Sequence, residues 1–125
     1  MASQPTAFTQ QVGIEHPIIC GAMYPCSNPE LVAAASEAGG IGIVQPISLT
    51  YVHGYEYDKG LDFIREKTQK PIGVNVLVEK SSQVYEDRMK KVVDTSIEKG
   101  VKFYITALGN PRWVVDKVRL CVIVT

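Results

Sequence analysis

The chain has 125 residues, of which 46% are hydrophobic, and its formal net charge is +0 at pH 7, which is typical of one compact globular unit. The dispersed charges argue against a nucleic-acid-binding arm, and no apolar run approaches the roughly 18 residues of a membrane span. We therefore expect a cytoplasmic protein that binds neither nucleic acid nor a membrane.

The first predicted unit is a strand followed by a helix. Residues 17–23 are apolar and end in small side chains, which predicts a short buried strand. A helix is predicted over 30–38, with Ser27 or Asn28 as its N-cap and Pro29 in its first turn. Apolar residues at three- and four-residue spacing predict its packed face, namely Leu31, Ala34, Ala35 and Ala38.

The second predicted unit begins where Gly39-Gly40 ends that helix, because glycine accepts a left-handed backbone. Residues 41–44 form the next strand. The stretch 45–57 is polar and aromatic and is predicted to be a loop. A helix is then predicted over 58–69, which completes the second strand and helix pair.

Two further units follow. Residues 72–78 are rich in valine and isoleucine, which favours a strand buried on both faces. The helix predicted over 82–98 places five apolar residues largely on one side, namely Val84, Met89, Val92, Val93 and Ile97. The fourth strand is 101–106, the turn is 107–111, and a last helix runs over 111–118.

Four strand and helix units in succession predict an α/β fold with a parallel sheet. The segment GAMYPC at 21–26 lacks the G-x-G-x-x-G phosphate fingerprint of a doubly wound dinucleotide-binding sheet. We therefore predict a partial TIM (β/α) barrel, in which residues 1–125 are the N-terminal portion of one domain. Loops after the strands carry the active site in that architecture.

A ledge for a planar ligand is predicted at the ends of two strands. Gly21 and Ala22 have almost no side chain, so a flat ring can approach the backbone, and Met23 adds a soft apolar contact. Asn75 is the lone polar residue of its strand and needs a partner that offers both a donor and an acceptor. The alternatives are that Gly21-Ala22 serves tight strand-to-helix packing and that Asn75 bonds a neighbouring loop.

The other reactive side chains give weaker signals. His16 precedes the first strand at the wrong end of a barrel, while His53 lies on the correct side, where a solvated histidine is favoured over a general base. The odd number of cysteines and their spacing favour reduced thiols and predict no metal site. Three tyrosines beside His53 form either a lid over the ring or an exposed aromatic loop, namely Tyr51, Tyr55 and Tyr57.

Four motifs in order carry a family resemblance over residues 13–118. They are PIICGAM at 17–23, NPELVAAASEAGGIGIV at 28–44, PIGVNV at 71–76 and EKGVKFYITALGNP at 98–111. With these motifs the chain resembles the flavin-dependent nitronate monooxygenases, formerly 2-nitropropane dioxygenases, and the related flavin-type enoyl-acyl carrier protein reductases. The resemblance implies an FMN-dependent oxidoreductase that oxidises alkyl nitronates with oxygen, or else reduces an enoyl thioester.

The resemblance also implies the position of the cofactor. FMN would lie across the strand ends against Gly21, Ala22, Met23 and Asn75, and the segment that contains Thr106 and Ala107 would lie nearby. Several nitronate monooxygenases have a histidine where this chain has Ala107-Leu108, so no catalytic residue is assigned. ITALGNP looks closer to the reductase-like branch.

Four strands cannot close an eight-stranded barrel, so the sheet edges are expected to be open. The apolar run 119–125 lacks a helix-ending glycine and is predicted to be a truncated or altered terminus. Negligible flavin turnover is expected from this chain alone. The alternative from another class is a non-catalytic half-barrel that self-associates through its open edges.

Overall fold

The computed structural model describes residues 5–119 and 121–124 and contains one sheet of five parallel strands. The strands are β1 (Ile19–Cys20), β2 (Ile41–Val44), β3 (Ile72–Leu77), β4 (Phe103–Ala107) and β5 (Val122–Val124). Their spatial order is the order of the chain, β1 to β5, without a reversal. A doubly wound sheet reverses its strand order at a switch point, whereas a barrel adds each strand beside the last. The sheet is therefore part of a (β/α) barrel, as predicted.

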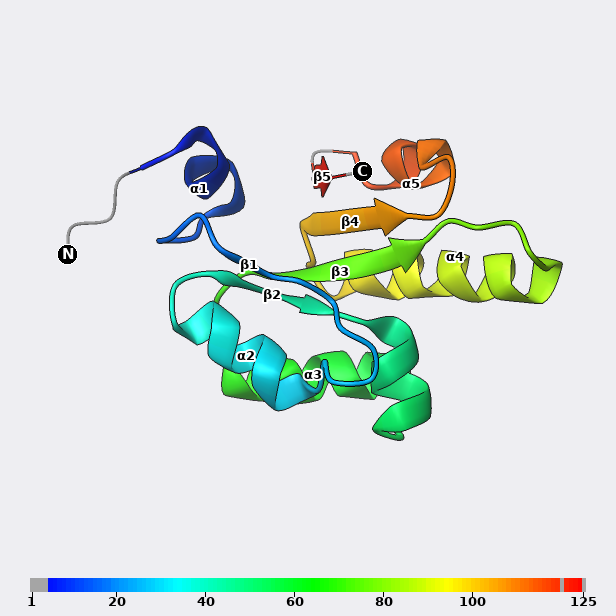
Figure 1. The fold of residues 1–125 in the computed structure, drawn as a ribbon, viewed down its shortest axis with the longest axis horizontal. Coiled ribbons are helices and arrows are strands. Elements are labelled where there is room, and N and C mark those ends of the chain that lie inside the picture. The colour runs from blue at the N-terminus through cyan, green and yellow to red at the C-terminus, as the bar shows by residue number, and fades with distance from the viewer. Residues whose placement is uncertain (1–4, 120, 125) are drawn as a thin grey trace.

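Helices connect the strands on the outer side of this sheet. They are α2 (Pro29–Glu37), α3 (Tyr57–Lys67), α4 (Gln83–Glu98) and α5 (Arg112–Lys117), and a π-helical turn, η1 (Ser48–Val52), precedes α3. A short helix, α1 (Ala7–Val12), precedes β1 and lies apart from α2, α3 and α4 (Figure 1). No helix among residues 5–119 and 121–124 combines the length and apolar character needed to cross a membrane.

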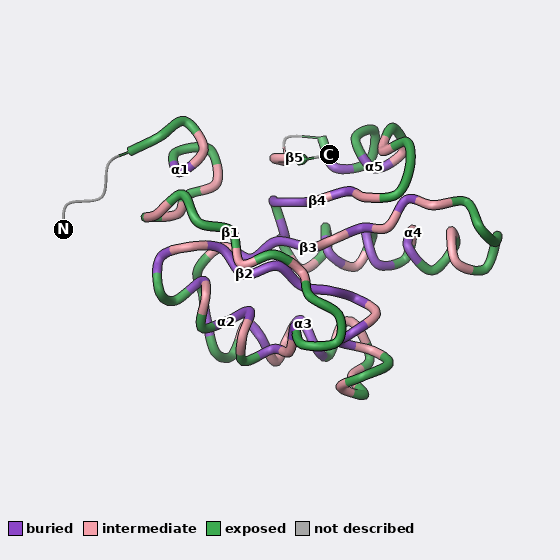
Figure 2. The backbone as a smooth tube through the Cα atoms, viewed as in Figure 1, coloured by how far each residue is buried: buried purple, intermediate pink, exposed green. Residues whose placement is uncertain are grey.

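Two apolar clusters lie on opposite faces of the sheet. The larger joins β3 to the helices and includes Val74, Val76 and Tyr104, each 0% exposed. The smaller, on the inner face, consists of Ile41, Ile43 and Phe103, with partly buried side chains from α1 packed against it. The ring of Phe8 meets that of Phe103 edge-on at 5.8 Å between centroids. Burial therefore concentrates along β2, β3 and β4 (Figure 2).

The packed face of α2 differs from the prediction. Its buried residues are Pro29, Val32, Ala33 and Ser36, whereas the residues expected to pack are only partly buried or exposed. The reason lies in β2, because a Cβ built on Gly42 would fall 2.1 Å from the carbonyl oxygen of Val32. The backbone of α2 rests directly on a glycine, which turns the contact face of the helix by about one residue.

The predicted face of α4 is wrong at both of its ends. Val84 is 70% exposed and Ile97 is 40% exposed, while Met89, Val92, Val93 and Ser96 are buried. The first strand was also predicted to be buried, but Ile18 and Ile19 are 63% and 40% exposed. The reason is position, because β1 lies at one edge of the sheet and has a neighbour on one side only.

One hydrogen bond decides between the two predicted caps of α2. Asn28 is the N-cap of α2, and its Oδ1 accepts a hydrogen bond of 2.8 Å from the amide of Leu31. Ser27 has a different role in the preceding loop, described below. Gly39, just beyond the helix, has φ +99°, the left-handed backbone that was expected there.

Three elements were not predicted. Helix α1 has only six residues and is held at its start by a capping box between Thr6 and Thr9. The turn η1 lies within the stretch predicted to be a loop. Part of the apolar run 119–125 pairs in parallel with β4 as β5, where Val122 is the partner of Phe103, while Leu120 and Thr125 lie outside the described residues.

Candidate functional site

The inner face of the sheet is filled at one end of the strands and polar at the other. A Cβ on Gly73 would lie 2.6 Å from both Ile43 Cδ1 and Phe103 Cδ1, so these two side chains close over the glycine. Side chains alternate along a strand, so Asn75 faces the same side as Gly73, two residues nearer the carboxyl end. The structure therefore places Asn75 above an apolar floor, at the end where a (β/α) barrel binds its ligands.

Asn75 is half-buried, and its side-chain amide has no hydrogen-bond partner among the described residues. Its Cα partner in β4 is Ile105, and no hydrogen bond of its side chain to any residue of the described part of the chain is found. Within residues 5–119 and 121–124, the structure therefore does not support the alternative that the Asn75 side chain bonds a neighbouring loop. A half-buried amide without a partner favours a ligand that can both donate and accept hydrogen bonds.

No contact within the described part of the chain explains why residue 21, Gly21, is a glycine. A Cβ built on it would have no heavy atom within 4 Å, and its φ lies outside the left-handed region. Tight strand-to-helix packing, the alternative for this position, is therefore wrong for Gly21. Ala22 packs against the inner-face cluster and Met23 is 46% exposed, so the two positions flank open space.

The loop that carries Gly21, Ala22 and Met23 is held by reciprocal hydrogen bonds. The amide of Met23 donates to the hydroxyl of Ser27 at 2.7 Å, and the amide of Ser27 donates to the carbonyl of Met23 at 2.8 Å. Ser27 is only 3% exposed. This buried serine fixes the backbone of the predicted ledge, a role that sequence reasoning did not assign because Ser27 was weighed only as a helix cap.

His53 holds the same loop from outside. Its Nε2 lies 3.0 Å from the carbonyl oxygen of Pro25, and a carbonyl can only accept, so Nε2–H donates. His53 is the C-cap residue of η1, so this bond ties the loop after β1 to the loop after β2 across 28 positions. His53 is therefore neither a free solvated side chain nor a base aimed at the ledge, but a latch between two loops.

Replacing His53 by alanine is expected to loosen the loop of residues 21–27 without unfolding the chain. Losing one exposed hydrogen bond of about 1 kcal/mol predicts amide hydrogen exchange about fivefold faster at Met23 and Ser27. His53→Gln can still donate to Pro25 and serves as the matched control, with near-native exchange. Unchanged exchange in His53→Ala, measured by mass spectrometry or NMR, would show that the latch has no effect on the loop.

The two predicted site residues of β4 lie on opposite faces. Phe103 and Ile105 belong to the inner-face cluster, so alternation places Ala107 on the side of Asn75 and Thr106 on the side of the helices. Thr106 is 6% exposed, and its Oγ1 has no hydrogen-bond partner among the described residues. Only the main chain of Thr106 therefore faces the predicted ledge, and its role in cofactor binding stays a prediction.

The turn after β4 rests on the turn after β3. A Cβ on Gly109 would lie 2.8 Å from the carbonyl oxygen of Val78, which explains a small residue there. Leu108 has φ +67° and is 66% exposed, the one non-glycine positive φ among the described residues. Asn110 Oδ1 accepts a hydrogen bond from the amide of Arg112 and opens α5. The segment is a structured rim, as predicted for a turn that starts a helix.

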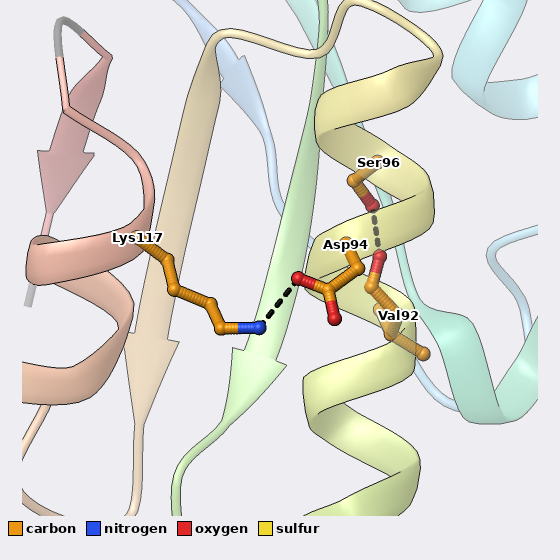
Figure 3. Close-up of polar contacts among 4 residues, drawn as sticks. All are labelled: Val92, Asp94, Ser96 and Lys117. Carbon is orange, nitrogen blue, oxygen red and sulfur yellow. Dashed lines mark hydrogen bonds and ion pairs between the residues drawn. The ribbon is translucent and has the colours of Figure 1, made fainter.

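The three tyrosines considered as a lid do different things. Tyr57 points into the helix layer, where its hydroxyl lies 2.7 Å from Ser96 Oγ. The hydroxyl of Ser96 donates in turn to the carbonyl oxygen of Val92 (Figure 3). Tyr55 stacks on Phe63 with 5.5 Å between ring centroids. Tyr51 is 58% exposed beside Arg88. Tyr57 is therefore part of the core and cannot close over a ligand.

Burial raises the pKa of Tyr57 and of Tyr104 above the usual value of about 10. Above that pH the unfolded chain loses protons that the folded chain keeps, so the free energy of unfolding falls as the pH rises. Tyr57→Phe is expected to make this decline shallower in urea titrations between about pH 8 and pH 11. The exposed Tyr24→Phe is the control, and identical declines in both variants would contradict the assignment.

The remaining reactive groups lie apart from the ledge or form no cluster. The three cysteines, Cys20, Cys26 and Cys121, are free thiols, as expected. His16 lies beside Glu15, with 3.6 Å between Nε2 and Oε1, before β1. Within residues 5–119 and 121–124, no three His, Cys, Asp or Glu side chains are grouped as metal ligands would be.

Two curated proteins are similar to this chain in sequence. A dehydrogenase of Rhodococcus jostii that acts on a 5-hydroxy-7a-methyl-1-oxo-octahydro-1H-indene-4-carboxyl-CoA is 29% identical over 95% of this chain and 31% of its own. A probable nitronate monooxygenase of Staphylococcus aureus is 38% identical over 56% of this chain and 19% of its own.

Solved structures share the fold. FabK from Thermotoga maritima is similar with a TM-score of 0.72 and 32% identity, covering 93% of this chain and 34% of FabK. A nitroalkane oxidase from Streptomyces ansochromogenes, at 21% identity, has a TM-score of 0.69 over 91% of this chain and 40% of its own. The chain thus spans 19–40% of the length of these relatives. The family model of nitronate monooxygenases matches residues 5–124, and the chain belongs to this family.

Proposed function

We propose that this chain supplies part of the cofactor site of an FMN-dependent oxidoreductase of the nitronate monooxygenase type, which oxidises alkyl nitronates with oxygen. One observation carries the proposal. The amide of Asn75, which has no partner among the described residues, and the open space over Gly21 lie toward the carboxyl ends of β3 and β1, on either side of β2 and above an apolar floor. Family membership supports flavin as the ligand of this ledge.

The chemistry of the ledge suits a flavin ring. The pyrimidine part of the ring presents both donors and acceptors along its edge, and the Asn75 amide offers the complementary pair. Gly21 allows a flat ring to approach the main chain, and Met23 gives an apolar contact. Bound there, FMN would supply the redox chemistry, while these residues hold and orient the ring.

The expected behaviour of the chain by itself is binding without turnover. The chain spans 31% of the Rhodococcus relative and 34% of FabK, so the activity and substrate of a whole enzyme are proposals. No histidine lies at Ala107-Leu108, and His53 is held by Pro25. The ledge therefore positions a ring but offers no side chain as a general base.

Riboflavin tests the ledge because it carries the ring without the phosphate. Saturable quenching of riboflavin fluorescence by the purified chain is the expected result. Oxygen uptake with FMN and propyl-2-nitronate should stay at the protein-free rate. Absence of saturable riboflavin binding contradicts the proposed cofactor site, and rapid oxygen uptake contradicts the expected lack of turnover.

A flavin-type enoyl-acyl carrier protein reductase is the second candidate. The absence of a histidine at Ala107-Leu108 and the 32% identity to FabK favour it. It predicts oxidation of a reduced nicotinamide that depends on a crotonyl thioester, in place of oxygen uptake that depends on a nitronate. Both assays are run side by side on the chain with FMN. A rate above the blank in either assay would contradict the expected lack of turnover and would show which of the two chemistries the chain supports.

Self-association is the candidate from another class. Strands β1 and β5 are the two edges of the sheet, and exposed apolar side chains flank them, such as Ile18 at 63% and Val124 at 41%. Unpaired edges of this kind can pair with a second chain. Size-exclusion chromatography with light scattering measures the oligomeric state. A monomer contradicts this candidate, whereas a dimer that does not bind riboflavin supports it.

A further inference from the structure

A cavity lies at the end of the sheet opposite the ledge. It has a volume of about 270 Å³ and is bounded by α1, by the end of α3 and by the starts of β3 and β4. Its lining residues are Gln11, Val12, Arg65, Gln69, Pro71, Ile72, Gly100, Lys102 and Phe103. All of them belong to the described part of this chain.

The charge of this cavity has one sign. Arg65 and Lys102 both line it, and no carboxylate does. Neither cation forms a salt bridge with a carboxylate of residues 5–119 and 121–124, whereas Lys99, just before Lys102 in the chain, pairs with Asp62 at 2.6 Å. Two cations over one cavity repel each other, and an anion between them removes that repulsion.

Arg65 is the stronger of the two signals because it is partly buried. Burial lowers the pKa of its guanidinium, which means that hydration has been lost without a compensating anion. One of its five N–H groups donates to the carbonyl oxygen of Lys70 at 2.8 Å and so helps to close the end of α3. That contact explains why the side chain is held in place, but it leaves most of its donors free.

The other lining residues indicate which class of ligand would fit the cavity. Val12, Pro71, Ile72 and Phe103 form an apolar wall, while the amide side chains of Gln11 and Gln69 lie among the polar groups. We propose that this cavity is a second binding site, which takes a small organic oxyanion whose carboxylate or phosphate is bound by Arg65 and Lys102 and whose apolar body lies against the wall. The site does not rest on the proposed flavin function.

Phenyl phosphate and benzoate are the probes, because each joins an oxyanion to an apolar ring. We expect saturable shifts of the Gly100 and Lys102 amides in NMR spectra of the labelled chain, recorded without flavin. Whichever probe binds more tightly identifies phosphate or carboxylate as the preferred head. Phenol has the ring without the charge and should give no saturable shift. Equal binding of phenol, or no saturation by either anion, overturns the proposal.

Four variants locate the binding. Arg65→Gln is expected to weaken the preferred probe at least about tenfold, because a charge-assisted bidentate contact is lost. Arg65→Lys keeps the charge without the planar fork and should give an intermediate affinity. Lys102→Gln, an exposed side chain, tests the site even where changes at Arg65 disturb the end of α3.

Arg88→Gln is the matched control, since it removes the same charge from a residue outside the cavity. It should leave the affinity unchanged. Native affinity in both Arg65→Gln and Lys102→Gln, or an equal loss in Arg88→Gln, shows that the anion does not bind here. Riboflavin binding by the same variants should be unchanged, which separates failure of this site from failure of the flavin ledge.

Discussion

Replacing Gly42 by alanine is expected to lower the free energy of unfolding by about 3 kcal/mol or more, or to prevent folding. The added Cβ would lie 2.1 Å from the Val32 carbonyl oxygen and 2.7 Å from its Cα. These are backbone atoms of α2, so no side-chain rotation relieves the clash, and the whole helix must withdraw from β2. Urea denaturation followed by circular dichroism measures the loss.

Gly21→Ala is the control for that experiment, because it makes the same chemical change where no heavy atom lies within 4 Å of the new Cβ. Its effect on stability should stay within about 0.5 kcal/mol. A Gly42→Ala chain as stable as Gly21→Ala would mean that α2 does not rest on β2 through its backbone. The comparison therefore tests the helix contact that the sequence pattern placed on other residues.

Asn75→Leu is expected to weaken riboflavin binding at least about tenfold while leaving the chain folded. The substitution removes the side-chain amide proposed to bond the polar edge of the ring, and a bound polar group left without its partner weakens binding strongly. The side chain has no protein partner in the described residues, so its loss breaks no internal hydrogen bond, and leucine has a similar size. Fluorescence titration gives the affinity, and urea denaturation gives the stability.

Thr106→Val is the matched control on the neighbouring strand. It removes a hydroxyl that is buried on the helix side without a partner in the described chain, so stability should rise by about 1 kcal/mol. Riboflavin affinity should stay as it is. Equal affinity in Asn75→Leu and the unaltered chain would remove Asn75 from the ledge, and a large loss in Thr106→Val would place the ring on the other face.

The sequence by itself determined the alternation of strands and helices and most of their limits. These features depend on neighbours along the chain, such as the Asn28 cap and the left-handed Gly39, and so they are written locally. The position of Asn75 within an apolar strand was likewise sufficient to select it as a candidate site residue. The residues of the proposed ledge were therefore selected from the sequence, and their binding of a flavin stays a prediction.

Only the tertiary structure decided what depends on residues far apart in the chain. Strand order separates a barrel from a doubly wound sheet, because both share the same local pattern. The face of α2 is decided by Gly42 in a different element, and the burial of Tyr57 by Ser96 on α4. His53 meets Pro25 across 28 positions, a hydrogen bond that no periodicity encodes, because periodicity reports which side of an element is apolar and not which element it meets.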